Sequence, residues 1–118
     1  MADVELVQGT LELLVLKTLS LEPMHGWGIA QRIEQFSRNT FSVNQGSLYP
    51  ALQRMKRKGW IRSEWRVTEN NRRARYYDLT PVGARQLEEE RRRWSLSTDA
   101  VSWILGATLD TSTGEARA

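Results

Sequence analysis

The sequence predicts a mainly α-helical protein with one small β-hairpin and a long helix near its C-terminal end. Three observations support this fold class. Three segments before residue 60 space their apolar residues as one helix face does, at intervals of three and four. Residues 60–67 and 74–79 read as two antiparallel strands that flank a polar turn. A Thr-Pro helix start at residues 80–81 opens a helical pattern that runs to about residue 108. This order predicts a winged helix-turn-helix domain followed by a dimerisation helix.

Length and composition are those of a single globular domain with an appendage. The chain has 118 residues, of which 40% are apolar and 26% charged. No stretch approaches eighteen consecutive apolar residues, and acidic residues stand where a signal peptide would carry cations, so we expect a cytoplasmic protein with no membrane partner. There is no cysteine, which excludes disulfides, thiolate metal sites and thiol nucleophiles.

Positive charge is concentrated in one part of the chain. Residues 54–75 contain nine Lys or Arg against two Glu, a net charge of +7, whereas the remaining residues carry −4. Such an asymmetry places positive potential on one region of the fold and favours a polyanionic partner. The alternative interpretation of the charge alone is a solvated basic surface.

The N-terminal helix is predicted over residues 7–20. Val7, Leu11, Leu14 and Val15 share one helix face, and further leucines widen this stripe almost all round. The helix must therefore be covered on more than one side. One side belongs to its own domain, and we expect the other, including Leu11, to contact a second copy of the chain.

Two further helices follow. The breakers Pro23, Gly26 and Gly28 precede a helix that ends near residue 37 or 38. The next helix begins at Asn44, whose side-chain oxygen can accept from the free amides of the first turn, and stops at Gly59 in a left-handed conformation. Its inward face consists of residues four and three apart, namely Leu48, Leu52 and Met55.

The two strands form a hairpin that turns at Asn70 and Asn71, residue types that adopt turn conformations at little cost. Trp60 and Trp65 are expected to seal this hairpin against the helices, and Trp27 to seal the start of the second helix.

The last helix is capped by Thr80 and has Pro81 at its first helical position. It is too long to be covered by a domain of about eighty residues, so its distal half is predicted to pack on a second copy. We expect residues 1–79 to form the winged domain, 80–109 the dimerisation helix and 110–118 a flexible tail. Heptad spacing and the N-terminal stripe place the dimer contacts at Leu11, Leu87, Trp94, Val101, Ile104 and Leu105.

The residue types present do not support catalysis, and we expect no catalytic residue, metal ligand or cofactor. His25 is the only histidine and lies in a Pro/Gly turn, where a structural or solvated role is expected. No glycine-rich phosphate loop follows a strand, because Gly26 and Gly28 lie between helices.

Several features instead agree on double-stranded DNA as a partner. The outward face of the third helix carries Gln, Ser and Arg, which read base edges, and its free amides can hold a phosphate. Arginines flank the hairpin turn, where they can reach the DNA backbone or a narrow minor groove. The candidate DNA-binding residues are Asn44, Gln45, Ser47, Tyr49, Pro50, Gln53, Arg54, Arg57, Arg72, Arg73 and Arg75. A solvated turn is the alternative for the hairpin tip.

Four segments carry a resemblance to a known family. QGTLELLVLKTL, HGWGIAQRI, NQGSLYPALQRMKRKGWI and RRARYYDLTPVGARQL resemble, in order and spacing, the signature segments of the PadR transcriptional regulators, over about residues 7–87. The resemblance implies a winged-helix repressor that dimerises through its C-terminal helix, binds inverted-repeat operators and releases them when a small effector binds. With one helix after the wing, the chain resembles the short subfamily.

By position, the resemblance implies that residues 44–58 are the recognition helix and that Tyr49 lies near the DNA. Trp94 is similar in placement to the paired tryptophans with which short members clamp flat ligands, which implies a small apolar or aromatic effector. Two departures stand out: Trp27 replaces a commoner tyrosine, and TENNRR replaces a glycine-rich wing tip. The alternative function is a small-molecule-sensing or protein-interaction module that binds DNA weakly.

Overall fold

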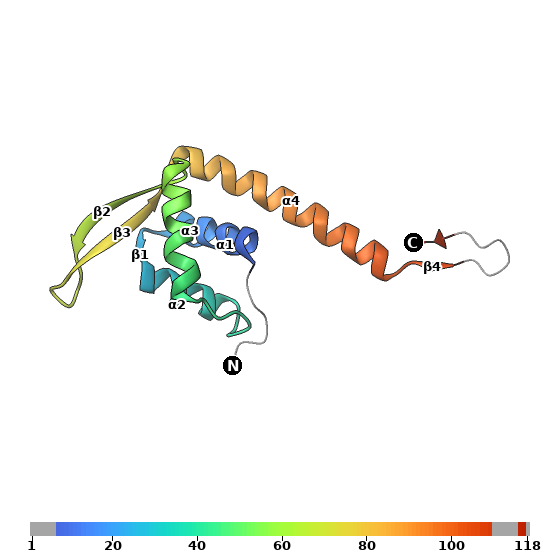
Figure 1. The fold of residues 1–118 in the computed structure, drawn as a ribbon, viewed down its shortest axis with the longest axis horizontal. Helices are drawn as coiled ribbons and strands as arrows, with labels where there is room; N and C mark the ends of the chain where they lie inside the picture. Colours follow the sequence, from blue (N-terminus) through green and yellow to red (C-terminus); the bar gives the residue numbers. More distant parts are fainter. Residues whose placement is uncertain (1–6, 110–115, 118) are drawn as a thin grey trace. The chain divides into compact units, whose positions relative to one another are not determined.

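The N-terminal part of the chain is built from three helices and a three-stranded antiparallel sheet. In the computed structural model, which describes residues 7–109 and 116–117, α1 spans Gln8–Leu21, α2 Gly26–Phe36 and α3 Gln45–Arg57 (Figure 1). The hairpin strands are β2 (Ile61–Val67) and β3 (Arg73–Leu79). The predicted fold class, mainly helical with a small hairpin, is confirmed.

The sheet contains one strand that the sequence did not predict. Strand β1 (Met24–His25) pairs with β3, so the strand order is β1-β3-β2. In this register Met24 lies opposite Tyr77 and His25 opposite Tyr76. A run of two residues is too short to show the alternation by which a strand is recognised in a sequence. Strand β1 pairs with the edge of β3 that β2 does not occupy.

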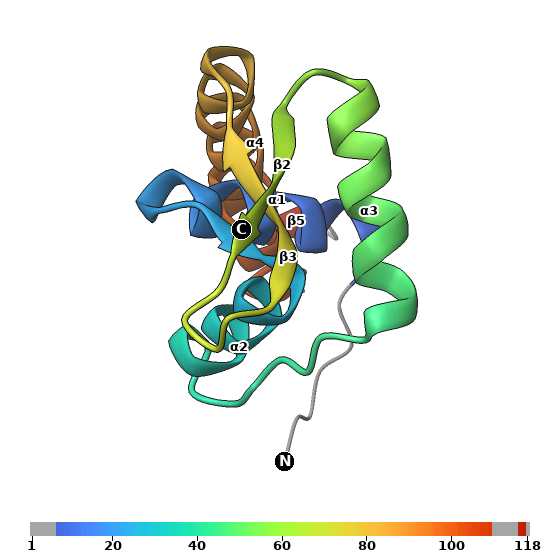
Figure 2. The ribbon, with the colours of Figure 1, turned by 90° about the vertical axis from the view of Figure 1, so that its left-hand side faces the viewer.

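The core of this part lies between the three helices and the sheet. Helix α1 contacts α2, α3 and β3, and α3 also contacts β2. Viewed from the hairpin side, α3 stands beside β2 (Figure 2). The predicted inward residues Leu48, Leu52 and Met55 are fully buried. Helix α3 therefore packs against the core through this one face.

Three predicted helix boundaries have the expected local chemistry. The Asn44 side-chain oxygen accepts from the Gly46 amide at 2.7 Å, and Gly59 has φ +76° just after α3. The Thr80 hydroxyl oxygen accepts from the Gly83 amide at 3.0 Å and caps the last helix. A Cβ on Gly83 would lie 2.0 Å from the carbonyl oxygen of Trp60, so only glycine allows this helix to start against β2.

The last helix, α4, spans Pro81–Leu105 and ends three residues before the predicted limit. The chain divides into two compact units at residues 87 and 88, so the first turns of α4 belong to the winged unit. Beyond α4, β4 (Thr108–Leu109) pairs with β5 (Ala116–Arg117), a pairing the sequence did not predict. The rest of the predicted tail, residues 110–115 and 118, lies outside the described residues.

Candidate nucleic-acid interface

The outward face of α3 is polar and open to solvent. Because Leu48, Ala51, Leu52 and Met55 occupy the buried side, the residues between them must point away from the core. Pro50 has no N–H, so the Gly46 carbonyl receives no helical bond from position 50 in the first turns. The exposed candidates on this helix and its cap are Asn44, Gln45, Ser47, Tyr49, Pro50, Gln53 and Arg57.

Arg54 differs from the other candidates on α3. Its Nε donates to Glu12 Oε1 at 3.2 Å, and the Glu12 side chain on α1 is only 10% exposed. This half-buried ion pair ties α3 to α1. Arg54 therefore holds α3 in place, and the base or phosphate contact that the sequence suggested for it stays a prediction.

The connection between α2 and α3 is held by Glu34. Its backbone carbonyl accepts from the Asn39 amide at 2.8 Å, and its side-chain Oε2 accepts from the Val43 amide at 3.0 Å. Arg38 and Asn39 both adopt positive φ, which lets the chain turn sharply between the helices. These bonds fix where α3 begins relative to α2.

Tyr49 leans from α3 towards the start of α2. A Cβ on Gly26 would lie 2.7 Å from the Tyr49 hydroxyl oxygen, so Gly26 is required for this approach. Burial raises the pKa of the neighbouring Tyr77 phenol, and Tyr49 adds to this, whereas Arg75 lowers it. Tyr77 therefore stays a neutral hydroxyl at physiological pH.

The wing is the part of the hairpin beyond the core. Its turn is closed by Thr68, whose amide donates to the Arg72 carbonyl at 2.7 Å and whose carbonyl accepts from the Asn71 amide at 2.9 Å. Asn71 has φ +59°, as its turn position requires. Arg72 and Arg73 are exposed and Arg75 is half-buried.

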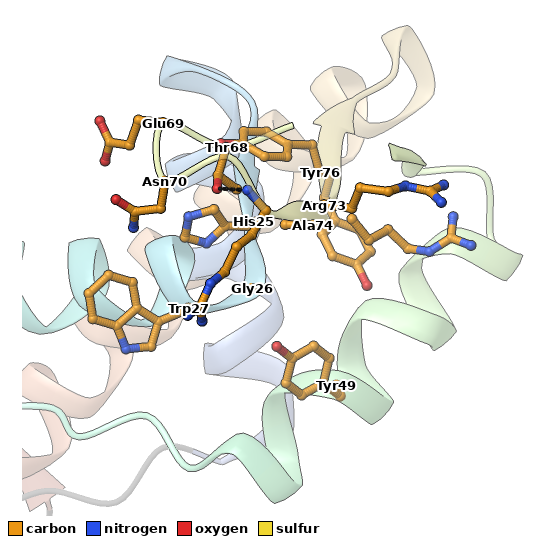
Figure 3. Close-up of a pocket in the computed structure, with 13 residues that line it drawn as sticks. His25, Gly26, Trp27, Tyr49, Thr68, Glu69, Asn70, Arg73, Ala74 and Tyr76 are labelled. Carbon is orange, nitrogen blue, oxygen red and sulfur yellow. Dashed lines mark hydrogen bonds between the residues drawn. The ribbon is translucent and has the colours of Figure 1, made fainter. Parts of the chain in front are cut away.

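A hollow of about 640 Å³ separates the wing from the two helices that face it. It is lined by the start of α2, by Tyr49 on α3 and by the hairpin between residues 68 and 77 (Figure 3). In the close-up, Tyr49 and Arg73 come to this hollow from different elements. Tyr49 is thus the one α3 candidate that lines this hollow, where it meets the wing candidates Arg72, Arg73 and Arg75.

Two tryptophans predicted to be sealed are exposed. Trp27 is 60% exposed and Trp65 54%, whereas Trp60 is packed against the core as expected. Trp65 does lie on the face of β2 that it shares with the buried Ile61, but there its ring lies beneath the Arg73 and Arg75 side chains and stays more than half exposed. Trp27 stacks on His25, with ring centroids 6.2 Å apart.

His25 has the structural role that the sequence suggested. Its Nδ1 accepts from the Gly28 amide at 3.0 Å and so caps α2. The described residues contain no cluster of three or more His, Cys, Asp or Glu that could hold a metal ion.

Comparisons with known proteins agree with this geometry. The model of the transcriptional regulator PadR-like family matches residues 15–89, more than half of the chain. The chain belongs to the PadR-like family. Members of this family are transcriptional regulators that bind DNA and are not enzymes.

Two kinds of relative support the assignment. Transcriptional regulator Rv3488 of Mycobacterium tuberculosis is 34% identical over 88 residues, which cover 75% of this chain and 78% of that protein. A PadR family regulator from Clostridium difficile is 28% identical with a TM-score of 0.71, covering 81% of this chain and 98% of that one. A PadR family regulator from Eggerthella lenta is 29% identical with a TM-score of 0.73, covering 84% of each chain.

The predicted dimer residues of this PadR-like chain fall into two groups. Leu11 and Leu87 are 3% and 5% exposed, because they pack into the core of the winged unit and have little surface left for a partner. The other four are more than half exposed on the distal part of α4: Trp94, Val101, Ile104 and Leu105.

Two exposed apolar residues of α4 were not among the predicted dimer contacts. Leu96 and Trp103 are 64% and 60% exposed, and at 100° per residue they lie on the side of the helix opposite Trp94. Their seven-residue spacing was visible in the sequence. Within the described residues, no helix is long and apolar enough to cross a membrane.

Proposed function

We propose that the protein is a homodimeric repressor that binds an inverted-repeat operator in double-stranded DNA and is relieved by a small effector. The observation that carries this proposal is the exposed polar face of α3 beside a hairpin whose arginines Arg72, Arg73 and Arg75 have no carboxylate within ion-pair distance among the described residues. An α-helix fits the major groove, and free guanidiniums fit phosphates.

Within this proposal the residues of α3 divide by position. Gln45 and Ser47 are exposed in its first turn, where side chains of a recognition helix reach base edges. Gln53 and Arg57 follow on later turns and are also exposed. The Asn44 oxygen already accepts the capping bond from Gly46, and the side-chain amide hydrogens of Asn44 can donate to DNA.

The wing would contribute backbone contacts. Arg72 and Arg73 are exposed beside the turn, and Arg75 borders the hollow that Tyr49 also lines. Phosphate contacts set the register of a protein on the duplex and provide most of the salt dependence of binding.

The dimer is supported by the distal part of α4. The exposed apolar side chains there would be stabilised by contact with a second copy, because solvent exposure of several large apolar residues on one helix is unfavourable. A two-fold dimer would place its two recognition helices in successive major grooves about 34 Å apart. This spacing is what an inverted repeat requires.

The effector site would include Trp94, which is 52% exposed. A pair of such indoles from two subunits would offer flat apolar surfaces to an aromatic ligand. If α4 helices form the dimer, a ligand between them can alter the separation of the recognition helices.

The decisive experiment is selection of bound duplexes from a random pool with the purified protein. We expect an inverted repeat with half-sites about one helical turn apart. Gln45→Ala and Ser47→Ala should each change base preference at one position per half-site. Gln35→Ala, which removes an exposed glutamine from α2, is the matched control and should leave the selected sequence unchanged. If the selection enriched no sequence, the proposal that the protein binds a specific operator would be contradicted.

The alternative, a ligand-sensing module with weak DNA binding, makes a different prediction. A flat cationic dye would quench tryptophan fluorescence, and duplex DNA would show no salt-sensitive retention. Trp94→Leu should abolish the quenching under either function, so DNA retention is the measurement that separates the two.

A further inference from the structure

The two faces of the β2-β3 hairpin carry arginines in different environments. On one face, Arg62 pairs with Asp78 at 3.3 Å, and Arg66 pairs with Glu64. Arg66 also lies over the Tyr76 ring. The charges on this face are therefore balanced by carboxylates within the hairpin itself.

The opposite face carries Trp65 with two arginines on it. Arg75 is directly across from Trp65 in the strand register, and Arg73 lies two residues further along the same face. Their guanidinium carbons are 4.9 Å and 5.1 Å from the centroid of the indole ring. Arg75 Nη1 also donates to Ser63 Oγ at 3.0 Å. Both guanidiniums are thus held by the hairpin, and the part of the chain that the structure describes places no carboxylate within ion-pair distance of either.

Two cations held over one indole repel each other, and the ring offsets that repulsion only in part. A cation over an exposed aromatic ring contributes about 0.5–1 kcal/mol, whereas an anion between the two guanidiniums would interact with both. Trp65 is 54% exposed, so it does not fill a core. The arrangement suits a partner that brings negative charge to this face.

The cluster also borders the proposed DNA-binding surface. Arg73 and Arg75 line the same hollow as Tyr49 of α3 (Figure 3). The hairpin face that carries Trp65 also carries Ile61 and Tyr77, which are 2% exposed in the core beneath the helices, so this face is directed to the helices and the balanced face is directed away from them.

We infer that Trp65 is a positioning residue, which holds Arg73 and Arg75 together so that they bind one segment of the DNA backbone. The inference rests on the proposed function, because it requires that the winged unit binds DNA. It adds that the wing presents this one face to phosphates and that the indole acts through the two arginines.

The test measures binding to a mixed-sequence 30-base-pair duplex as a function of salt, because phosphate contacts do not require the operator. Removing both arginines, in Arg73→Ala/Arg75→Ala, should lower the slope of log K against log salt by about 1.8, at about 0.9 per phosphate. Trp65→Leu keeps both charges but should weaken binding about fivefold and lower the slope by about 1. Trp65→Phe keeps an aromatic ring and should restore most of the loss.

A double-mutant cycle separates positioning from direct contact. In the Arg73→Ala/Arg75→Ala background, Trp65→Leu should have no further effect on affinity or slope. An equal loss in both backgrounds would mean that the indole contacts DNA by itself, which overturns the inference. If Trp65→Leu lowered the affinity for DNA without changing the slope of log K against log salt, Trp65 would have a merely structural role.

The opposite face supplies the matched control. Arg62→Ala/Arg66→Ala removes the same two charges from the same hairpin, but these arginines are already paired with Asp78 and Glu64. We expect a much smaller change in slope than for the Trp65 face. Equal changes for the two faces would overturn the assignment of the DNA-facing side. Salt-independent binding by the unmodified protein would instead overturn the proposed function and, with it, this inference.

Discussion

The two compact units of the chain use their apolar residues in opposite ways. In the unit that ends at residue 87, Leu16, Leu48 and Leu52 are completely buried. In the described part of the other unit, Val101, Ile104, Leu105 and Leu109 are all more than half exposed. The first unit has a core of its own, whereas the apolar residues of the second have no such core and would be stabilised by another chain.

The same chemical change should therefore have different effects in the two units. Leu52→Ala is expected to lower the free energy of unfolding of the winged unit by about 2–5 kcal/mol, because it leaves a cavity in a closed core. Chemical denaturation should show this loss at every protein concentration. Leu105→Ala is the control, and its effect should depend on protein concentration because the side chain is 81% exposed within one chain. A loss for Leu105→Ala as large as that for Leu52→Ala, and independent of concentration, would contradict the comparison.

Charge placed on the exposed part of α4 should act on association and leave the winged unit folded. Ile104→Asp/Leu105→Asp is expected to convert dimers to monomers in sedimentation experiments at micromolar concentration, because each aspartate would have to be desolvated in the interface. Arg92→Asp adds negative charge on a side of the helix away from Leu105 and should leave the dimer intact. Finding single chains in the unmodified protein would remove the basis for the proposed dimer.

The two units also differ in how far their ion pairs are buried. Glu12→Gln breaks the pair with Arg54 and is expected to lower the free energy of unfolding by about 1–3 kcal/mol, because the glutamate side chain is only 10% exposed. Glu88→Gln removes a pair with Arg91 on α4 whose members are 71% and 56% exposed, and should cost less than about 0.5 kcal/mol. Thermal unfolding of the two variants side by side measures the difference. Equal decreases in melting temperature for the two variants would show that burial does not make the Glu12–Arg54 pair more stabilising than the Glu88–Arg91 pair.

The last prediction concerns the N-terminal cap of α4, the helix that runs through both units. Thr80→Ala removes the side-chain cap of α4 and should cost about 1 kcal/mol. Thr80→Ser, which keeps the hydroxyl, is the control and should retain most of the stability. A loss confined to the winged unit is expected, since the first turns of α4 belong to it.

Much of the fold could be predicted because the signals are local. Asn44, Gly59 and Thr80 each satisfy a requirement of the adjacent backbone, and the structure places all three as predicted. The outward face of α3 was predictable for a similar reason, since the buried positions leave only one side for Gln45 and Ser47. Arg54 could not be separated from that face, because its partner Glu12 is 42 residues away in the chain.

The sequence by itself determined where α3 begins and ends, where α4 begins, which residues form the core side of α3, and where the positive charge is concentrated. These follow from spacing and capping, which act over a few residues. Only the tertiary structure decided that Leu11 and Leu87 are used within one chain, that β1 joins the sheet, and that Trp65 stands exposed under two arginines. The physical reason is that burial depends on which elements extend past one another, and alternation along a strand specifies a face but not whether anything covers it.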